Sequence, residues 1–421
     1  MYEFGTDADY QAQLDWAEDF VRTEVEPLDL VFPNPYDRRD ARAMAAARPL
    51  MDAVRANGLW ACHLPPGLGG GGYGQLKLAL LNEILGRSVW APTIFGCQAP
   101  DSGNAEILAH FGTDDQRKRY LQPLLDGDIV SSFAMTEPQG GSDPRLFTTT
   151  ATRHGDDWVL NGEKWFATSA RDADFFIVLA VTDPTVAIHE GASMFIVAAD
   201  TPGFEIVREL HVGAEPATAN VHGYLRFTDA RLPGDAILGE PGTAFTIAQT
   251  RLGGGRVHHA MRTIGQARKA LDAMCERAVS RRTRNGTLAD YGQTQQAIAR
   301  SWIEIEQFRL LVLRTAWLID KHQDYKRVRI DIAAIKAAAP DLLHNIVRRA
   351  IHLHGALGVS TEMPFVRMLV ESEWLALVDG PTEVHEATIA KQLLREVTPA
   401  PDDFPSTHLP RLTAAALAKL A

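Results

Sequence analysis

The spacing of apolar residues changes twice along the chain, and it divides the sequence into three parts. Residues 7 to about 130 follow a helical spacing, interrupted by loops such as HLPPGLGGGGYG at 63–74. From about 131 to 240, short runs rich in β-branched and aromatic residues alternate with Gly, Pro and Asp, as strands and turns do. Long amphipathic runs return after LPGDAILGEPG at 232–242. This order of elements predicts an α+β chain.

The middle part contains several predicted strands, which we expect to form a small β-barrel or sandwich. Two β-rich runs lie on either side of Asn161-Gly162, a dipeptide typical of two-residue hairpin turns. We therefore predict a hairpin at this position. Further strands are predicted at ADFFIVLAVTD, SMFIVAAD, GFEIVREL and HGYLRFTDA, each bounded by turn residues.

The last third of the chain contains a helical run with two apolar faces, SWIEIEQFRLLVLRTAWLID at 301–320. A helix of this kind usually lies inside a bundle or is buried by a partner subunit. We therefore expect a C-terminal four-helix bundle. One face carries Trp302, Ile305, Val312, Ala316 and Ile319, and the other carries Ile303, Leu310, Leu313 and Trp317.

These patterns predict four segments with different architectures. The first three are an N-terminal helical domain at 1–130, a middle β domain at 131–240 and a C-terminal helical bundle at 241–397. The remaining residues, 398–421, begin with the Pro-rich stretch TPAPDDFPSTHLPRL, which predicts a surface tail.

Composition narrows the class of protein without identifying it. The chain has 421 residues, of which 46% are hydrophobic and 23% charged, as expected for a globular enzyme of two or three domains. Its formal net charge of −11 argues against a general nucleic-acid binder. A local basic patch for a phosphate-bearing ligand is compatible with that charge.

Cysteine usage and the N-terminal segment predict a cytoplasmic protein. Cys62, Cys97 and Cys275 are widely spaced and form no CxxC pair, which argues against a zinc site or a disulfide framework. The first residues, MYEFGTDADYQAQLDW, lack the basic and apolar segments of a signal peptide. No apolar run approaches the roughly 20 residues of a membrane span, so we expect no membrane partner.

The glycines at 67–72 formally match the GxGxxG pattern of dinucleotide-binding folds, through Gly67, Gly69 and Gly72. That pattern requires a preceding buried strand and a helix that opens at the loop. Prolines at 65–66 stand where such a strand would end. We therefore interpret the segment as a flexible loop between helices.

Histidines offer no convincing metal site. His258 and His259 are adjacent on a predicted helix, so their side chains point in different directions. Three or four ligands at suitable spacing are needed for a metal such as zinc. We predict no metal, and we give His385 little weight as a base.

Two segments at the start of the β region have the composition of a site for a flat ligand. SSFAMTEPQGGSDP at 131–144 offers hydroxyl groups at Thr136 and Ser142 around a Gly-Gly corner, where a backbone can approach a ligand closely. KWFATS at 164–169 places two aromatic residues just before Thr168, an aromatic wall beside a hydroxyl. Either segment alone is more often core or turn material.

A third segment, LVDGPTEVHEATIAKQLL at 377–394, places Asp379 before a Gly-Pro corner and an amphipathic run. An Asp at this position suits a turn or the entry to a helix, with Pro381 at the first helical position. It also suits a base that is held at the end of a loop. The residues alone leave both readings open.

Taken together, these segments resemble the acyl-CoA dehydrogenase family from about residue 10 to about 397. FAMTEPQGGSD and NGEKWFATSA resemble the two flavin-contact segments of that family. GRVHHAMRTIGQARKALD at 255–272 resembles the helix that begins with a substrate-side arginine, and HGALGVSTEMPFVR at 354–367 resembles the glycine-rich segment near the FAD pyrophosphate. VDGPTEVH at 378–385 is similar to the segment that carries the catalytic carboxylate. The family's fold has the three parts predicted above.

Within the family, the chain resembles a branch with an Asp-Gly-Pro-x-Glu-Val-His catalytic segment, some eukaryotic members of which carry a kinase-like domain. The branch also has the patterns APD-S/T-GN, here Ala99 to Asn104, and GR-x-HH-x-MR. The resemblance implies an FAD-dependent oxidation of an acyl thioester of coenzyme A or of a carrier protein. It implies an electron-transferring flavoprotein as acceptor, and a homodimer or homotetramer.

The resemblance also implies roles for individual residues. Asp379 would be the base and Arg256 would lie beside it on the substrate side. Gly380 would approach the thioester, and Ser142 would lie between the FAD pyrophosphate and the substrate. Arg282 would reach the FAD of a neighbouring subunit. The implied FAD-binding residues are Phe133, Met135, Thr136, Ser142, Phe166, Thr168, Arg282, His352, Gly355, Thr382 and Glu383.

The implied reaction is an α,β-dehydrogenation to a trans-2-enoyl thioester, with Asp379 taking the α-proton and flavin N5 accepting the β-hydride. Most family members have Glu at the position of Asp379, and Asp is shorter by about 1.5 Å. The branch matched here also has Asp. Some members place the base near position 255, but Gly255 has no side chain that could serve.

Three departures from the family pattern affect the predicted FAD contacts. Asn285 stands where a Phe is usual, His352 replaces a Gln and Ala356 replaces a Gly. We therefore expect FAD to bind with altered outer contacts. Two alternative functions follow: a flavin oxidase or monooxygenase on the same fold, as in nitroalkane oxidases with an aspartate base, and a scaffold that has lost its flavin.

Overall fold

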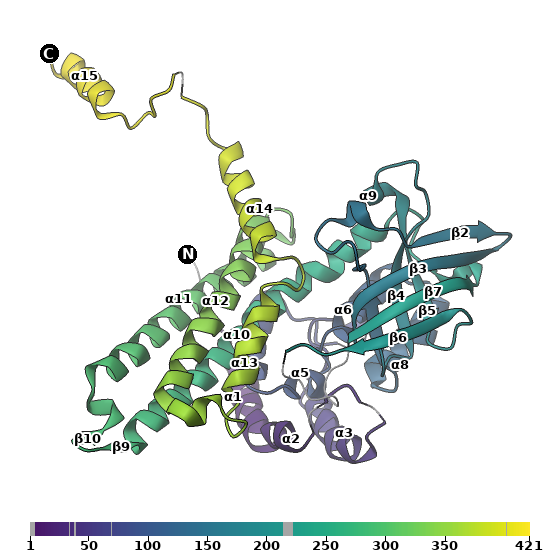
Figure 1. Ribbon diagram of the computed structural model, residues 1–421, viewed down its shortest axis with the longest axis horizontal. Helices are drawn as coiled ribbons and strands as arrows, with labels where there is room; N and C mark the ends of the chain where they lie inside the picture. Colours follow the sequence, from purple (N-terminus) through teal and green to yellow (C-terminus); the bar gives the residue numbers. More distant parts are fainter. Residues whose placement is uncertain (1–4, 33, 38, 69, 214–221, 401) are drawn as a thin grey trace.

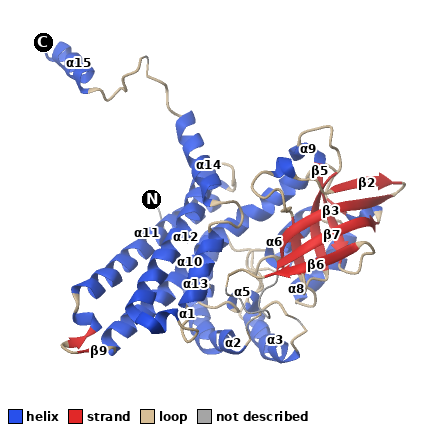
Figure 2. Ribbon diagram, in the orientation of Figure 1, coloured by secondary structure: helices blue, strands red, loops and turns tan. Residues whose placement is uncertain are grey.

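The computed structural model describes residues 5–32, 34–37, 39–68, 70–213, 222–400 and 402–421. Helices precede and follow a region of strands, in the order predicted from the apolar pattern (Figure 1 and Figure 2). The sheet lies at one side of the molecule, and the long helices lie side by side at the other. None of the described helices is long and apolar enough to cross a membrane.

The N-terminal part is built from short helices that pack around aromatic and aliphatic side chains. Asp7 caps the first helix, since its carboxylate accepts a hydrogen bond from the Tyr10 N–H at 2.8 Å. The loop at 63–74 connects two helices in its described residues, as expected. The helices are α1 (Ala8–Phe20), α2 (Glu26–Val31), α3 (Ala41–Ala56), α4 (Gln75–Leu85), α5 (Ala91–Ile94), α6 (Asp101–Phe111), α7 (Asp114–Gln116) and α8 (Gln122–Asp126), with π-helical turns at Val21–Val25 and Arg117–Leu121.

Eight strands in the described residues form one sheet, with the order β6-β7-β3-β2-β4-β5-β8 and β1 paired in parallel with β4. Its central strand β4 is buried along its whole length. The strands are β1 (Ser131–Ala134), β2 (Thr150–His154), β3 (Asp157–Thr168), β4 (Phe175–Val181), β5 (Ala192–Ala198), β6 (Phe204–Leu210), β7 (His222–Leu232) and β8 (Ile237–Leu238).

The hairpin predicted at Asn161-Gly162 is wrong. Strand β3 runs through both residues, and its hairpin with β2 turns instead between His154 and Asp157. Gly162 has φ of 137° and lies at a register shift between β3 and β7. A β-carbon there would lie 2.6 Å from the Thr149 backbone, so the glycine serves a close approach of two chain segments within the sheet.

Four long helices form most of the C-terminal part. They are α10 (Ala244–Ser280), α11 (Gly292–His322), α12 (Arg329–His354) and α13 (Phe365–Leu375), followed by α14 (Thr382–Arg395). A small hairpin of β9 (Arg282–Thr283) and β10 (Gly286–Thr287) joins the first two. A separate helix, α15 (Leu409–Leu420), ends the predicted surface tail and has no buried residue. It lies away from the rest of the chain in Figure 1.

Both predicted apolar faces of α11 are only partly covered. On the first face Ile305 and Val312 are buried, whereas Trp302 is 55% exposed. On the second face Leu313 is buried, whereas Leu310 is 51% exposed. The bundle of one chain therefore leaves apolar surface on α11 uncovered.

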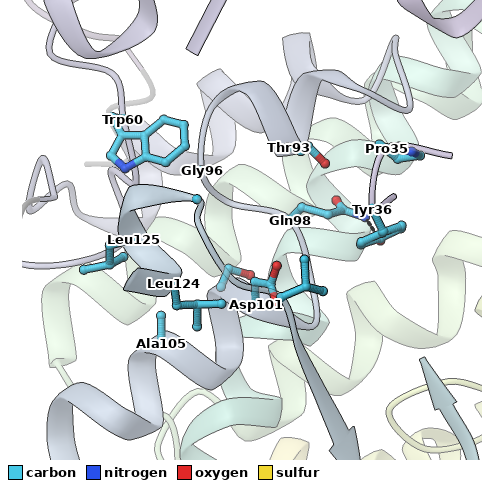
Figure 3. Close-up of a pocket in the computed structure, with 13 residues that line it drawn as sticks. Pro35, Tyr36, Trp60, Thr93, Gly96, Gln98, Asp101, Ala105, Leu124 and Leu125 are labelled. Carbon is cyan, nitrogen blue, oxygen red and sulfur yellow. Dashed lines mark hydrogen bonds between the residues drawn. The ribbon is translucent and has the colours of Figure 1, made fainter. Parts of the chain in front are cut away.

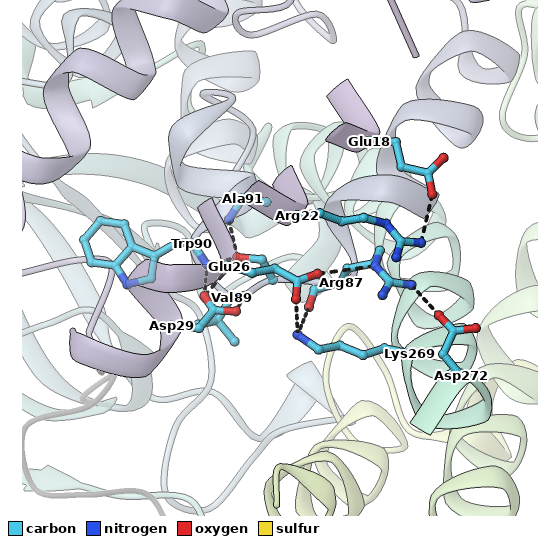
Figure 4. Close-up of polar contacts among 11 residues, drawn as sticks. Glu18, Arg22, Glu26, Asp29, Arg87, Val89, Trp90, Ala91, Lys269 and Asp272 are labelled. Carbon is cyan, nitrogen blue, oxygen red and sulfur yellow. Dashed lines mark hydrogen bonds and ion pairs between the residues drawn. The ribbon is translucent and has the colours of Figure 1, made fainter. Parts of the chain in front are cut away.

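A polar cluster fastens the N-terminal helices to α10 (Figure 4). Arg87, which follows α4, contacts Glu26 of α2 at 3.3 Å and Asp272 of α10 at 3.0 Å. Lys269 of α10 reaches Glu26 at 3.1 Å and donates to the Arg87 carbonyl at 2.8 Å. Beside it, the Asp29 carboxylate accepts from the Ser88 hydroxyl at 2.9 Å. This cluster fixes the C-terminal half of α10 to the N-terminal helices. The N-terminal half of α10 contacts the sheet at β5.

Candidate active site

Asp379 lies in a strained turn between α13 and α14. Its φ is 54° and that of Gly380 is 102°, so two consecutive residues adopt positive φ. Such a conformation is uncommon for a residue with a β-carbon, and it is found where a structure holds a functional group in place. The Asp379 side chain is 17% exposed. Its own N–H donates no hydrogen bond to any other described residue.

Cationic side chains surround the Asp379 turn. The Arg256 Nε donates to the Asp379 carbonyl at 2.9 Å, which ties α10 to the turn. Lys336 of α12 is buried and donates to the Leu375 carbonyl at the end of α13. Burial lowers the pKa of Lys336 to about 8, while the nearby Asp379 charge opposes that shift. The turn is therefore held from α10 and from α12.

Two histidines adjoin the same carboxylate and are uncharged at neutral pH. The His259 Nε2 lies 3.5 Å from the Asp379 Oδ2, and burial lowers the pKa of His259 to about 4. Burial likewise lowers the pKa of His385 to about 4. The His385 Nε2 is buried, has no hydrogen-bond partner among the described residues, and faces Gly380. It is therefore a polar group that a ligand at the turn could satisfy.

Three successive glycines of α10, Gly253 to Gly255, let neighbouring side chains approach the helix backbone beside this turn. A β-carbon on Gly255 would lie 3.2 Å from the Asp379 Oδ2. A β-carbon on Gly254 would lie 3.3 Å from the Glu106 Oε2. At Gly253 it would lie 3.5 Å from the Tyr325 ring. The helix thus presents bare backbone to three polar side chains.

Arg251 connects this segment to the sheet. Its guanidinium carbon lies 4.0 Å from the centroid of the Phe133 ring, within cation–π range. Its Nε donates to the Asn104 Oδ1 at 2.9 Å. The charges of Asp379, Glu106 and Asp101 all act on Arg251, so the partly buried guanidinium is shared by three carboxylates.

The two segments predicted to face a flat ligand lie together in the fold. The Trp165 N–H donates to the Thr136 carbonyl at 2.8 Å, and the Ser132 hydroxyl donates to the Thr168 carbonyl at 2.7 Å. Phe166 has φ of 55°, and its ring is stacked on that of Trp165 at 5.2 Å between centroids.

A buried ion pair fixes the first of these segments. The Lys164 Nζ lies 2.8 Å from the Glu137 Oε1 and also donates to the Met135 carbonyl at 2.9 Å. Burial lowers the pKa of Lys164 to about 8, although the Glu137 charge opposes that shift. The Glu137 carboxylate accepts from the N–H groups of Thr148 and Thr149. Residues 135–137 therefore have little freedom to move.

The same region has the groups that a planar cofactor would use. Phe166 is 49% exposed although it is a large aromatic side chain. The Trp165 Nε1 is buried without a hydrogen-bond partner among the described residues. A β-carbon on Gly141 would meet only the Thr136 side chain, at 3.8 Å, so no other group crowds the backbone at this glycine. An open aromatic face, hydroxyl groups and an unpaired donor fit a flavin ring.

Other predicted cofactor residues lie at the opposite end of the bundle. Arg282 is exposed on β9, which Figure 1 shows far from the sheet. Because α12 runs back along α11, His352 and Gly355 at its C-terminal end lie toward the β9–β10 hairpin. Thr382 and Glu383 instead follow the Asp379 turn at the start of α14. One chain therefore does not bring all the predicted residues together.

A narrow cavity beside α6 lies apart from the residues predicted above (Figure 3). Asp101 on its wall accepts from the Ser131 N–H at 2.8 Å and so supports the start of β1. Its lining includes Tyr36, Trp60, Gln98, Ala105 and Leu124. No sequence-predicted site residue lines it, so we treat it as a packing defect.

Sequence reasoning missed Glu106 and Arg251. Both belong to helical runs in which a single charged residue carries no chemical signal. The run of three glycines at 253–255 was a usable signal, because glycine costs a helix about 1 kcal/mol per residue relative to alanine. Three such residues in succession within one helix indicate that other groups must come close to its backbone.

Comparison with known proteins identifies the family. Models of the N-terminal, middle and C-terminal domains of acyl-CoA dehydrogenases match residues 7–128, 132–230 and 242–394. The chain is 40% identical over 399 residues to the probable acyl-CoA dehydrogenase FadE2 of Mycobacterium tuberculosis, covering 92% of this chain and 95% of that protein. This chain belongs to the acyl-CoA dehydrogenase family, whose members are FAD-dependent oxidoreductases.

Longer relatives match over part of their length. The chain is 38% identical to mouse acyl-CoA dehydrogenase family member 11, covering 92% of this chain and 50% of that protein. The chain thus spans about half the length of that relative.

Solved structures agree in fold. A putative acyl-CoA dehydrogenase from Mycobacterium abscessus has a TM-score of 0.86 at 38% identity, covering 93% of this chain and 99% of that one. A glutaryl-CoA dehydrogenase in complex with glutaryl-CoA has a TM-score of 0.81 at 26% identity, covering 94% and 97%. One from Mycobacterium smegmatis in complex with FADH2 has a TM-score of 0.78 at 25% identity, covering 93% and 96%.

Proposed function

We propose that the chain dehydrogenates an acyl-CoA thioester between its α and β carbons, with Asp379 as the base. The observation that carries this proposal is the Asp379 turn. A mostly buried carboxylate stands in a turn of positive φ, is tied to α10 by Arg256, and faces the bare backbone of Gly255. The reacting carbons of a thioester would lie beside this carboxylate.

Several residues of this chain would then have separate roles in the reaction. The Asp379 carboxylate takes the α-proton. Its free N–H is available to the thioester oxygen, which gains negative charge as that proton leaves, and such placed donors are often a large catalytic contribution. Gly380 would lie beside the thioester, and Ser142 would lie between the substrate and the cofactor's pyrophosphate. Arg256 positions the turn through its hydrogen bond to the Asp379 carbonyl.

FAD would supply the acceptor for the hydride that leaves the β-carbon, so that the thioester becomes a trans-2-enoyl thioester. Phe166 and Thr168 would face the flavin ring, and Phe133, Met135 and Thr136 would line its edge. Support comes from the exposed ring of Phe166 and the unpaired Trp165 Nε1 beside it. Thr382 and Glu383 would lie near the adenosine part.

We further propose that the working enzyme is a homodimer or homotetramer. Arg282, His352 and Gly355 lie at the far end of the bundle, where they would serve the FAD of a neighbouring subunit. The exposed apolar residues of α11 would then be covered by that neighbour. An Arg282→Ala variant is expected to lose FAD with its own Asp379 turn intact, as measured by bound flavin per chain.

An anaerobic titration tests the reaction class. Addition of an acyl-CoA should bleach the flavin absorbance, and air should restore it slowly, with an electron-transferring flavoprotein as the expected acceptor. Rapid reoxidation by air with peroxide release would favour the oxidase alternative instead. A colourless protein that does not take up added FAD would favour the scaffold alternative. We keep the cytoplasm as the predicted location, on the cysteine usage noted above.

A further inference from the structure

His222 lies directly opposite Thr168 on the neighbouring strand of the sheet. The two residues are register partners on β7 and β3, so their side chains leave the sheet on the same face. The His222 Nδ1 lies 3.2 Å from the Thr168 Oγ1, within hydrogen-bond distance. The imidazole therefore contacts the hydroxyl group that the proposed function assigns to the flavin ring.

The neighbours of His222 hold its ring beside this part of the sheet. Its centroid lies 6.2 Å from that of the Phe166 ring, and the two rings make an angle of 61°. The next residue is Gly223, where a β-carbon would lie 2.5 Å from the Ala170 side chain, so the glycine lets the turn after β3 come close to β7. His222 thus contacts both residues expected to face the flavin, Phe166 and Thr168.

His222 is uncharged at neutral pH. Burial lowers its pKa from the usual 6.5 to about 4, and the nearby charge of His211 acts in the same direction. A neutral imidazole carries one N–H, on either of its nitrogens, so the Nδ1 can donate to the Thr168 oxygen or accept from it. The direction of this hydrogen bond determines where the Thr168 hydroxyl proton points.

We propose that His222 is a positioning residue, which donates its Nδ1–H to the Thr168 oxygen and so directs the Thr168 hydroxyl proton toward the flavin ring. This inference rests on the proposed function, since it takes Thr168 to face that ring. A threonine hydroxyl has a single proton, and donation of that proton to the ring leaves the oxygen free to accept from His222. Hydrogen bonds in such a chain strengthen one another.

This arrangement favours the oxidised form of the cofactor over the reduced form. Hydrogen bonds to the ring nitrogens of a flavin tune its electronic properties. Oxidised flavin has unprotonated ring nitrogens that accept hydrogen bonds, and two-electron reduction turns one of them into an N–H donor. A hydroxyl proton directed at the ring stabilises the acceptor and opposes the donor. Loss of His222 frees the Thr168 hydroxyl to rotate, so the reduction potential of the bound flavin should rise.

The test is the reduction potential of the bound flavin, measured by anaerobic redox titration of the holoenzyme without an acyl thioester. His222→Leu removes the donor and should raise the potential by about 30 mV, which corresponds to about a tenfold change for a two-electron couple and to one net hydrogen bond. His222→Asn should keep most of the wild-type potential. Its amide nitrogen is bonded to Cγ, as the imidazole Nδ1 is, so it can donate from the same place.

A double-mutant cycle separates this role from simple packing. Thr168→Val removes the hydroxyl and should raise the potential at least as much as His222→Leu does. Adding His222→Leu to Thr168→Val should change the potential no further, because His222 acts through the hydroxyl. His154→Leu makes the same change at an exposed position on β2 and should keep the wild-type potential.

The possible results distinguish this inference from the proposed function. An unchanged or lowered potential in His222→Leu, or a shift that persists in the Thr168→Val background, would overturn this inference alone. An unchanged potential in flavin-bound Thr168→Val would overturn the proposed position of Thr168 at the ring, and this inference with it. If His222→Leu does not fold, His222→Gln takes its place. The Gln amide lies one bond farther out, so this variant should raise the potential where His222→Asn does not, and equal potentials in the two would contradict the inference.

Discussion

The helix α10 contains glycines in two regions, and they serve opposite purposes. At Gly265 a β-carbon would lie 2.1 Å from the Glu83 carbonyl oxygen, because α10 crosses α4 in direct backbone contact. At Gly255 a β-carbon would meet only the tip of the Asp379 side chain, at 3.2 Å. The glycine at 265 lets α10 and α4 touch, and the glycine at 255 lets the Asp379 carboxylate approach the backbone of α10.

The comparison shows how the role of a glycine can be inferred from what its missing side chain would meet. Rigid backbone at the contact, as at Gly265 and its neighbour Gly86, indicates packing. Polar side-chain tips, as at Gly254 and Gly255, indicate that functional groups lie close to the helix backbone. Glycine weakens a helix by about 1 kcal/mol in either case, so only the surroundings distinguish the two uses.

A side chain at position 255 should have the largest effect on activity. Gly255→Leu would place a side chain where Asp379 and the thioester must meet, and we expect kcat/KM to fall about a hundredfold or more, as small misplacements at a reacting centre do. Gly255→Ala is the matched smaller change. It should lower activity less while it raises helix stability by up to about 1 kcal/mol.

Steady-state rates and thermal unfolding of both variants measure these effects. A Gly255→Leu enzyme with wild-type kcat/KM would show that the substrate does not use this space.

Filling the packing contact should instead affect stability. In Gly265→Ala, the added methyl group must push α4 and α10 apart, and overpacking of this kind costs about 1–3 kcal/mol. Denaturant unfolding measures that loss, and kcat of the remaining folded enzyme should change much less. If Gly265→Ala unfolds like the wild type, the two regions do not differ as described.

The pH dependence of stability should distinguish the Glu106 end of the glycine segment from the Asp379 end. The pKa of Glu106 is raised to about 7 in the folded protein, so ionisation of Glu106 destabilises the fold. This penalty is absent below pH 4.5, grows as the pH rises toward 7 and stays constant above it. Glu106→Gln should therefore be more stable than the wild type at pH 8, by about 1–2 kcal/mol after allowance for partial solvent exposure.

Thermal unfolding of both proteins between pH 5 and pH 8.5 checks this expectation. An advantage of Glu106→Gln that stays constant over that range would mean that Glu106 does not titrate near neutral pH.

Much of the fold could be predicted from the sequence, because the spacing of apolar residues indicates which face of each helix or strand is buried. The order of helices and strands and the strands at β4 to β7 agree with the pattern. The hairpin at Asn161-Gly162 failed because local turn preference was overridden by the close approach of Thr149 within the sheet. The two faces of α11 match the expectation only in part, since a single chain does not cover them.

The candidate site was predictable where a short segment carries several chemical groups at once. The Asp379 turn and the segments around Thr136 and Thr168 belong to that kind. Glu106 and Arg251 reach the site through helix packing, from positions with no local signal. Glu106 faces Gly254 and Arg251 lies over the Phe133 ring. No spacing of residues in the sequence predicts these two contacts.

The most direct test of the central claim is the rate of anaerobic flavin reduction by an acyl-CoA in Asp379→Asn. The variant should keep FAD and its visible spectrum, because Asn fits the same turn. Its reduction should be slower than wild type by a factor of about 10²–10⁴, the usual contribution of a placed base. Reduction close to the wild-type rate in a variant that holds FAD would show that another group takes the proton.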